Sequence, residues 1–377
     1  MIKFPTFVLA ACVLAACSGN PFDQEDTGGT DGGTTAPTPA PDPSPSPIGD
    51  GSTPPGTTSP APNTAIVRYE ARGTGAADGN GFANGFRYDS GSDTFYVQGL
   101  AFDGDQPTGT PYTRVETAPG VPLPLGTGFA AYEGPSTVPD FLTGAPITQL
   151  SHRAIYRTST SGRTQLAIVR TGSYAGYGFG GYVYQRNQID STGVVLPTLP
   201  SQGQALYEGE YAGLRDFNGS GGLEYVTGDM EMAIDFDGFS GNCTPARCSD
   251  AVRGTVSNRQ VFDLDGTNVT ANIVGAINTE ENAALTGLPV LRFRVGPGVL
   301  DANGEIRGTI NSTFSNLDGR AIAYEEGNYY AIMAGDHTPG GTGGEIVGII
   351  VVEGNERRAP GTTFRETGGF IVERAVP

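Results

Sequence analysis

Residues 205–374 alternate between apolar and polar positions with a period of two. Met230, Met232 and Ile234 share one side of an extended chain, whereas Asp229 and Glu231 share the other. Such alternation is typical of a strand with one buried and one solvated face. The pattern predicts strands at 205–217, 223–236, 251–264, 268–278, 289–296, 305–315, 327–335, 345–353 and 363–374.

Short connections that carry Asn-Gly or Asp-Gly pairs separate these predicted strands. The pairs are Asn218-Gly219, Asp265-Gly266, Asn303-Gly304 and Asp318-Gly319. They supply the positive φ angle that tight hairpin turns need. Eight or nine antiparallel strands joined in this way must cover their edges, and closure into a barrel does so. We therefore expect residues 203–377 to form an up-and-down β-barrel.

Glycines inside the predicted strands fit the bends of a small, tightly coiled barrel. They are Gly254, Gly275, Gly308 and Gly348. A barrel that spans a membrane is the alternative, and it would present an apolar band with aromatic girdles to lipid. The strands instead carry charges at mid-strand, as in Arg292-Phe293-Arg294, which disfavours that alternative.

Residues 64–200 predict a smaller β domain that precedes the barrel, so the fold class is all-β. Two alternating segments, 153–157 and 165–170, flank a polar turn at 158–163, which is the pattern of a β-hairpin. Residues 197–202 are rich in Pro, Ser and Gln and predict a linker to the barrel.

The first residues have the features of a bacterial lipoprotein signal peptide. Lys3 supplies the positive charge, and Phe4–Leu14 form an apolar run that is too short to span a bilayer. The string Leu14-Ala15-Ala16-Cys17 predicts cleavage after residue 16 and lipidation of Cys17. A similar string ends at Cys12, but cleavage there would truncate the apolar run. An ordinary secretory signal cut nearby, leaving Cys17 as a free thiol, is the alternative.

Residues 17–63 predict a lipid-anchored, disordered tether. The segment consists largely of Pro, Thr, Ser, Gly and Asp, so it has little apolar surface to bury. Its alternating prolines favour an extended polyproline II conformation, which could reach on the order of 100 Å. The tether would therefore separate the lipid anchor from the folded domains.

The charge of the chain limits the classes of partner that it can bind. The formal net charge is −18, and Lys3 is the only lysine, so the mature chain has only arginines as cations. Nucleic-acid binding needs clustered cations, and so does lying flat on an anionic membrane. We therefore expect no nucleic-acid partner and no membrane contact other than the lipid. The acidity favours solubility, with a basic partner or metal cations as the alternative.

Cys243 and Cys248 are the cysteines that remain after the leader. In an exported protein their spacing predicts a disulfide that closes a small loop. A metal pair is the alternative, but zinc needs four ligands and no His or further Cys lies nearby in the sequence.

The sequence offers no catalytic motif. His152 and His337 are the two histidines, and neither lies in a Ser-His-Asp, HExxH or Gly-x-Ser-x-Gly context. We expect His337 to lie in a surface loop. Paired carboxylates such as Asp263 and Asp265 could suggest calcium, but the twelve-residue loop with its terminal Glu is absent. We expect no enzymatic activity, no cofactor and no metal.

The chain resembles one lobe of transferrin-binding protein B and related surface lipoproteins of Gram-negative bacteria. The resemblance rests on the layout and on two segments near the C-terminus. One comprises Tyr330–Gly335, an insertion at 336–343, and Gly344–Ile350, which keeps a Glu-Ile-x-Gly core but lacks the family's Gly-Pro and aromatic residues. The other, Phe364–Val372, resembles the last barrel strand. The resemblance implies a handle-like β domain and a barrel in which Glu345 and Gly348 help to close the barrel.

The resemblance also implies a location and a class of function. Ser18 follows Cys17 in place of the Asp that retains many lipoproteins at the inner membrane, so it implies the outer membrane. The resemblance implies binding of a protein or a small solute at loop tips, namely 243–248, 336–343 and Tyr174–Tyr184. Only one lobe is present, so transferrin recognition is not implied. A structural envelope lipoprotein without a soluble ligand is the alternative, and a secreted hydrolase is disfavoured.

Overall fold

The structure of the chain is a computed structural model. It describes residues 66–71, 79–83, 85–100, 109–126, 128–140, 142–148, 150, 152–172, 176–186, 189–190, 193–194, 197–239, 252–294, 304–341 and 343–375. The predicted signal peptide, Cys17, the tether, Cys243 and Cys248 lie outside the described residues.

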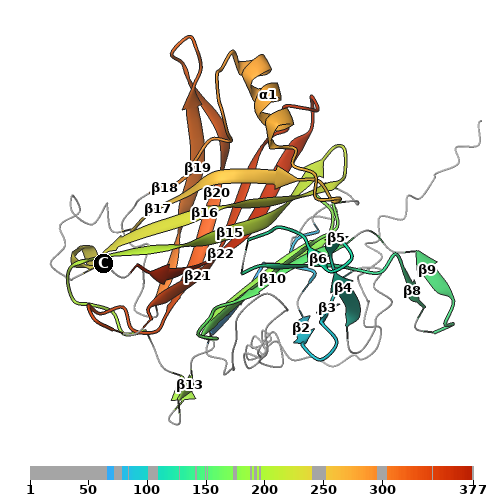
Figure 1. The fold of residues 1–377 in the computed structure, drawn as a ribbon, viewed down its shortest axis with the longest axis horizontal. Coiled ribbons are helices and arrows are strands. Elements are labelled where there is room, and N and C mark those ends of the chain that lie inside the picture. The colour runs from blue at the N-terminus through green and yellow to red at the C-terminus, as the bar shows by residue number, and fades with distance from the viewer. Residues whose placement is uncertain are drawn as a thin grey trace, which may run out of the picture. The chain divides into compact units, whose positions relative to one another are not determined.

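Eight antiparallel strands form a closed barrel in the C-terminal half of the chain (Figure 1). Each strand pairs with the next along the chain, and the last pairs with the first over residues 207–218 and 363–374. The strands are β15 (Gln204–Asn218), β16 (Leu223–Asp235), β17 (Val252–Phe262), β18 (Leu291–Arg294), β19 (Glu305–Ser315), β20 (Ala321–Ala334), β21 (Glu345–Asn355) and β22 (Thr363–Arg374). A 3₁₀ turn, η1 (Phe236–Phe239), follows β16. The predicted all-β class with an up-and-down barrel is confirmed.

The period-two pattern gives the barrel its interior. Met230, Met232 and Ile234 are buried, whereas Asp229 and Glu231 on the same strand are exposed. Inward-facing apolar side chains from all eight strands form one continuous cluster. Side chains therefore fill the barrel along its described strands.

One predicted strand is wrong. Residues 268–278 were expected to extend the barrel, but they contribute to helix α1 (Thr270–Glu281). Ile273, Val274 and Ile277 fall on one face of this helix and pack into the apolar cluster of the barrel. In a helix, residues one and four positions apart can share one face, whereas a strand would place Ile273 and Val274 on opposite faces. The predicted set of eight or nine strands is therefore eight.

Glycines inside the barrel strands make room for aromatic rings. Gly348 of β21 is paired directly with Phe370 of β22, and a Cβ atom at position 348 would lie 2.4 Å from Phe370 Cζ. Phe293 and Tyr329 cover two further glycines, Gly254 and Gly308. The ring that covers each glycine shields backbone that has no side chain of its own. Gly275, in contrast, lies in α1 with open space where a side chain would be.

A second sheet of eight strands precedes the barrel. In spatial order it comprises β1 (Ile66–Tyr69), β12 (Gly180–Arg186), β11 (Thr164–Arg170), β10 (Arg153–Thr158), β7 (Ala130–Glu133), β4 (Thr110–Arg114), β3 (Thr94–Gln98) and β2 (Gly85–Asp89). Three small hairpins accompany it: β5 (Glu116–Ala118) with β6 (Val121–Pro122), β8 (Thr137–Pro139) with β9 (Pro146–Thr148), and β13 (Ile189–Asp190) with β14 (Gly193–Val194). The predicted hairpin of 153–157 and 165–170 corresponds to β10 and β11.

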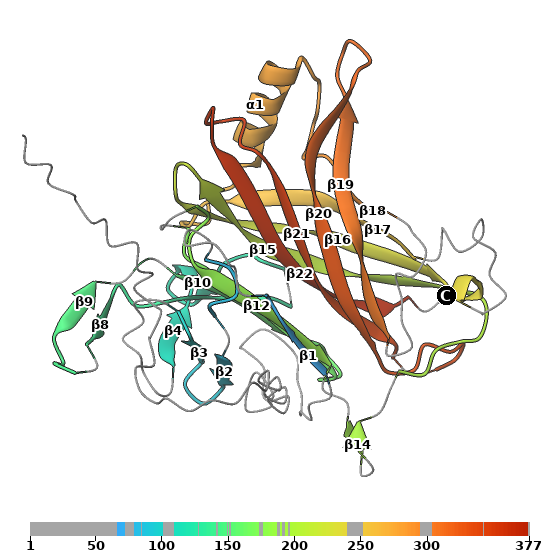
Figure 2. The same ribbon diagram turned by 180° about the vertical axis from the view of Figure 1, so that it is seen from behind.

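One face of this sheet packs against the outside of the barrel (Figure 2). Leu166 and Ile168 of β11 belong to the same buried apolar cluster as Val347 of β21 and Ile371 of β22. Residues on the opposite face of β10, β11 and β12 belong to a separate cluster that is rich in tyrosine and phenylalanine. The sheet is therefore buried on both faces along these central strands.

Polar contacts flank the apolar interface between sheet and barrel. On one side, Arg170 donates two hydrogen bonds of 2.8 Å to Glu70 and one of 3.0 Å to Thr367 of β22. Arg365, also on β22, donates to Asp216 at 2.9 Å. On the other side, Arg163 donates to the carbonyl oxygen of Gly343 at 2.9 Å.

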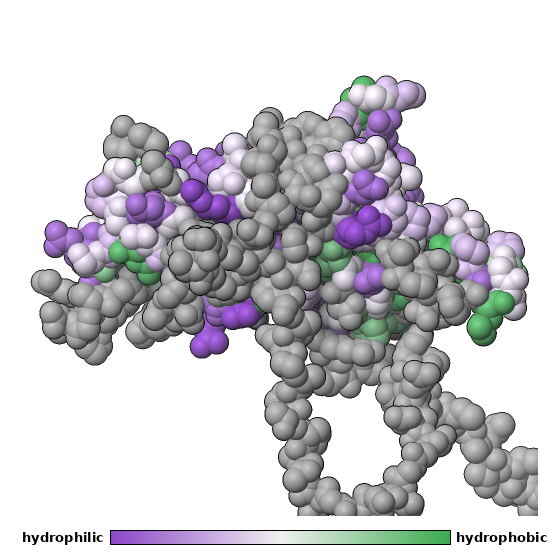
Figure 3. All heavy atoms as spheres, turned by 90° about the horizontal axis from the view of Figure 1, so that it is seen from below, coloured by the Kyte–Doolittle hydropathy of each residue, from purple (hydrophilic) through white to green (hydrophobic). Residues whose placement is uncertain are grey.

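On the face shown in Figure 3, the visible surface of the described residues is largely hydrophilic or neutral, with small scattered hydrophobic areas. Isolated apolar residues of this kind are normal for a protein surface. None of the helices in the described part of the chain is both long and apolar enough to cross a membrane.

Candidate functional site

One end of the barrel gathers a helix, three strand connections and a group of charged side chains. We call it the helix end and define it by α1 and by the connections 219–222, 316–320 and 356–362. The antiparallel pairing places these three connections at the same end, because β15, β19 and β21 finish there.

The C-terminal turn of α1 ties two of these connections together. The carbonyl oxygen of Asn282 accepts a hydrogen bond of 2.8 Å from the backbone of Leu317. Arg357, in the β21–β22 connection, pairs with Glu280 at 2.7 Å and with Glu281 at 2.8 Å. The helix therefore holds both hairpin tips in place.

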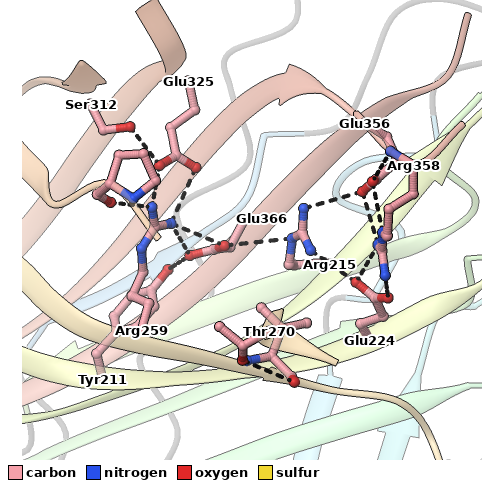
Figure 4. Close-up of polar contacts among 12 residues, drawn as sticks. Tyr211, Arg215, Glu224, Arg259, Thr270, Ser312, Glu325, Glu356, Arg358 and Glu366 are labelled. Atoms are coloured by element: carbon pink, nitrogen blue, oxygen red, sulfur yellow. Dashed lines mark hydrogen bonds and ion pairs between the residues drawn. The ribbon is translucent and has the colours of Figure 1, made fainter. Parts of the chain in front are cut away.

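Inside the barrel, beneath this end, Arg259 of β17 lies between two carboxylates (Figure 4). Its Nη1 donates to Glu325 of β20 at 3.1 Å and to Glu366 of β22 at 3.1 Å. Ser312 donates to Glu325 at 2.8 Å, and the hydroxyl of Tyr211 donates to Glu366 at 2.9 Å. Every polar partner here comes from a different strand.

The charged network continues from Glu366 to the β21–β22 connection. Arg215 of β15 lies 3.7 Å from Glu366 and donates to Glu224 of β16 at 2.9 Å. Arg358 donates to Glu224 at 2.7 Å and to Glu356 at 2.9 Å. The network of Arg215, Glu224, Arg259, Glu325, Glu356, Arg358 and Glu366, which we call the ionic network, therefore joins the barrel interior to a surface hairpin (Figure 4).

The environment shifts the pKa of several members of the ionic network. Burial raises the pKa of Glu325 above its ordinary value; the charge of Arg259 opposes this, and that of Glu366 adds to it. Burial also raises the pKa of Tyr211. Burial alone would raise the pKa of Glu356, but hydrogen bonding to Arg358 and the charge of Arg215 lower it overall. The carboxylate near the surface thus stays ionised more readily than the one deep in the barrel.

Two hollows flank the β21–β22 connection on the outside. The larger, of about 440 Å³, is lined by Tyr177, Glu326, Gly327, Asn328, Val351, Glu353, Gly354, Asn355 and Thr363. The smaller, of about 320 Å³, is lined by Glu280, Asn355, Glu356, Arg357, Pro360, Gly361, Thr362 and Thr363. Asn355 and Thr363 line both hollows, so the hairpin forms the wall that the two share.

Polar groups dominate the larger hollow. Glu326 of β20 and Glu353 of β21 are paired directly across the two strands, and both are exposed. Like charges directly opposite one another disfavour the pairing of two strands. Tyr177, from the sheet, closes one side, and its hydroxyl lies 2.7 Å from Thr363 Oγ1. The lining offers carboxylates, amides and hydroxyls to a ligand.

Leu317 is a large apolar residue that is exposed at the helix end. It is 67% exposed at the tip of the β19–β20 hairpin. Asn316 fixes this tip, because its side chain accepts a hydrogen bond of 2.8 Å from the backbone of Arg320. Together with the contact to Asn282, this bond holds Leu317 in one position above the barrel.

The prediction that His337 lies in a surface loop is wrong. His337 is fully buried, and its Nδ1 lies 2.7 Å from the hydroxyl of Tyr207. The loop folds back because the backbone of His337 donates to Thr198 and its carbonyl oxygen accepts from Arg374. Burial lowers the pKa of His337 to about 4. In the insertion 336–343, Pro339, Gly340 and Gly343 are the exposed described residues, so it offers few side chains for contact.

His152 is also buried, and it lies in the sheet, far along the chain from the helix end. Its Nδ1 lies 2.9 Å from the carbonyl oxygen of Leu150. Burial lowers the pKa of His152 to about 4, so the ring is neutral near pH 7.

The residues of the remaining predicted contact surfaces lie in different environments. In the stretch Tyr174–Tyr184, Tyr177 lines the larger hollow, whereas residues 180–184 form buried strand β12. Glu345, from the family-like segment, contacts the sheet: it accepts hydrogen bonds from Ser161 and Thr164. The disulfide predicted for Cys243 and Cys248 and the lipidation of Cys17 stay predictions. Among the described residues, no group of three or more His, Cys, Asp and Glu side chains could hold a metal ion.

Comparisons with known proteins give little beyond this geometry. No protein-family model matches the chain, and no curated protein matches it. Two crystal structures of transferrin-binding protein B from Haemophilus parasuis Hp5, a vaccine antigen, are similar to it. The double mutant is 9% identical with a TM-score of 0.34, over 84% of this chain and 47% of that one. The single mutant is 8% identical with a TM-score of 0.30, over 78% of this chain and 66% of that one. This chain thus spans less than two thirds of either structure.

Proposed function

We propose that this chain is a lipid-anchored binding protein of the outer membrane that holds a protein partner at the helix end and has no catalytic role. The observation that carries this proposal is that side chains fill the barrel interior, whereas the helix end is held in place by its contacts and has hollows at its surface. A ligand enclosed in the barrel would have to displace the apolar cluster and the ionic network. Binding at the surface requires no such displacement.

The helix end has the features of a protein-binding surface. Leu317 provides an exposed apolar side chain whose backbone is held by Asn282. A segment whose backbone is already held loses less conformational entropy on binding, which favours affinity. The two hollows beside the β21–β22 connection supply polar and acidic groups. Interfaces usually combine apolar anchors with polar groups.

The charges favour a partner with basic or amide groups. Glu326 and Glu353 are paired across β20 and β21 in the larger hollow, and the chain has a formal net charge of −18. A guanidinium, ammonium or amide group of a partner would relieve the repulsion between the two carboxylates. A protein with such donors near an apolar pocket therefore fits this surface.

The anchor places this surface at a distance from the membrane. Cys17 would carry the lipid, and residues 18–63 would form the spacer. An extended proline-rich spacer would let the folded domain reach partners away from the lipid headgroups on its own side of the membrane. Whether the domain faces the periplasm or the exterior is decided by protease treatment of intact cells, which removes it only if it is exposed.

Capture of partners by variants of the full-length protein tests the proposal. Leu317→Ser removes the apolar anchor at the helix end, and Leu142→Ser is the matched control because Leu142 is 88% exposed on the β8–β9 hairpin of the sheet. We expect L317S to weaken capture of a partner roughly tenfold or more, as truncation of an interface anchor does. L142S should capture it like the wild type. Equal capture by all three proteins would contradict the proposal, and capture of nothing would favour a structural lipoprotein.

A further inference from the structure

Two buried carboxylates share one guanidinium inside the barrel. Arg259 Nη1 lies 3.1 Å from a carboxylate oxygen of Glu325 and 3.1 and 3.2 Å from the two oxygens of Glu366. Arg259 Nη2 donates to Glu325 as well, and to the carbonyl oxygen of Pro289 at 2.8 Å. The side chains of all three charged residues are at most 1% exposed.

The ionic network holds one more carboxylate than it holds guanidinium groups. The guanidinium groups are Arg215, Arg259 and Arg358, and the carboxylates are Glu224, Glu325, Glu356 and Glu366. Water reaches the outer members, because Arg358 is 26% exposed. Glu325 and Glu366 are at most 1% exposed, and buried carboxylates that outnumber the guanidinium groups of their network resist ionising together.

We propose that the Glu325–Glu366 pair is a proton-binding site, and that the proton it takes up as the pH falls from neutral to mildly acidic stabilises the helix end of the barrel. The proposal does not depend on the proposed function. It makes the ionic network a pH-sensitive element, because Arg215 links Glu366 to Glu356 in the hairpin that separates the two hollows.

The charged and titratable groups that face Glu325 and Glu366 from the neighbouring elements determine which of the two carboxylates binds the proton. Arg259 of β17 and Arg215 of β15 are the cations. Ser312 of β19 donates to Glu325, and Tyr211 of β15 donates to Glu366. Tyr324 of β20 is buried beside Arg215 and Glu325, and burial raises its pKa, so it stays neutral. The other carboxylates are Glu224 and Glu356, which Arg358 holds at the outer end of the network.

Glu325 is the member that takes the proton. Burial raises its pKa above the ordinary value of 4.5, and Arg259 only partly offsets this. Glu366 has more positive charge beside it, since it pairs with both Arg259 and Arg215, whereas Glu325 pairs with Arg259. A carboxyl group whose pKa is raised by folding binds the proton more tightly in the folded state, so its protonation adds to stability as the pH falls toward 4.5.

Infrared spectroscopy of the full-length protein detects this proton directly. A protonated carboxyl group has a C=O stretch separate from the bands of a carboxylate, and an ordinary Glu is almost wholly ionised at pH 6. We expect a protonated-acid band at pH 6 in the wild type that is weaker in Glu325→Gln, because Glu345 and Asp216, whose pKa values burial also raises, are further sources of the band. Glu353→Gln, at an exposed position of β21, should leave the band unchanged.

Thermal unfolding gives the second readout. We expect the wild type to gain Tm between pH 7 and pH 5, by roughly 2–4 °C for each pKa unit of difference between the folded and unfolded chain. E325Q should lose part of that gain, since Gln cannot take up a proton, whereas Glu345 and Asp216 still can. An infrared spectrum in which E325Q retains the whole band at pH 6, or a Tm gain in E325Q equal to that of the wild type, would overturn the proposal.

A variant that keeps Glu325 tests the proposal even if E325Q does not fold. Ser312→Ala removes a hydrogen bond that favours the ionised form of Glu325. We expect S312A to show a stronger acid band at pH 6 than the wild type. An unchanged or weaker band would also overturn the proposal.

Discussion

Glu345 of barrel strand β21 accepts a hydrogen bond of 2.6 Å from Ser161, which lies in the turn between sheet strands β10 and β11. Its other carboxylate oxygen accepts one of 2.8 Å from Thr164. Glu345, which belongs to the family-like segment near the C-terminus, thus joins the barrel to a turn of the sheet 184 residues earlier in the chain. Burial raises the pKa of Glu345 overall, although its hydrogen bonds from hydroxyl groups and the charge of Arg163 oppose the rise.

Removal of one donor should destabilise this junction. Thr164→Val keeps the shape of a fully buried side chain but leaves Glu345 with one donor fewer. We expect a loss of roughly 1–3 kcal/mol in the free energy of unfolding at pH 7, measured with urea. The loss should shrink at pH 5, because the raised pKa lets Glu345 take up a proton. Thr137→Val, at an exposed position of β8, is the control and should change stability by less than about 0.5 kcal/mol.

The buried pair of Glu70 and Arg170 should respond to pH in the opposite direction. Burial alone would raise the pKa of Glu70, but the charge of Arg170 and its hydrogen bonds lower it overall. A carboxyl group whose pKa is lowered by folding adds stability above its unfolded value, here 4.5, and that stability is lost as the pH falls through the folded value.

Glu70→Gln should therefore cost roughly 3–5 kcal/mol at neutral pH, since it removes the carboxylate that Arg170 hydrogen-bonds and leaves this buried cation with Asp216, 3.9 Å away, as its charge partner. Chemical unfolding at a series of pH values measures this cost, which should shrink below pH 4.5. Glu133→Gln breaks a partly solvated pair with Arg153 and serves as the control, because Glu133 is 48% exposed. An E70Q cost that does not change with pH would contradict the assignment.

Two glycines should respond to alanine in opposite ways. Gly275→Ala places a methyl group in open space on α1, so we expect it to stabilise the protein by about 0.5–1 kcal/mol. Gly348→Ala would press against Phe370 and the carbonyl oxygen of Tyr330, so we expect a loss of roughly 1–3 kcal/mol. Urea unfolding of both variants measures the difference. Destabilisation by G275A would argue against a helix at 270–281.

The anchor can be tested by metabolic labelling with palmitate. We expect label on the wild-type protein and none on Cys17→Ala, because the predicted lipid attaches to the sulfur and amine of Cys17. Cys12→Ala should retain the label, since Cys12 lies within the predicted leader. Label on C17A would refute the predicted site.

Much of the barrel follows from local pattern. The period-two alternation and the Gly-containing turns predict the strands 305–315 and 363–374 with the bounds that the structure has. The same alternation fails at 268–278, because Ile273 and Val274 are adjacent apolar residues that a short window cannot assign to a strand or a helix. The packing of α1 into the barrel decides between them, and that packing is a property of the whole fold.

The ionic network was not predicted, although the sequence contains a signal for it. Arg215 lies between Tyr211 and Phe217 on the inward face of β15, and Glu366 lies between Phe364 and Phe370 on that of β22. A charged residue that shares the inward face of a strand with apolar neighbours indicates a buried ion. Its partners lie on other strands, so only closure of the barrel reveals them. His337 was misplaced for the same reason, since Thr198 and Tyr207 bury it from far along the chain.

Site-specific photo-crosslinking on intact cells tests the central claim most directly, namely that a protein partner binds at the helix end. A photoreactive amino acid replaces Leu317 in one variant of the full-length protein and Leu142 in another, since both positions are exposed hairpin tips. The account predicts a discrete crosslinked protein from position 317 that is absent at position 142. No crosslink from position 317, or the same products from both positions, would contradict it.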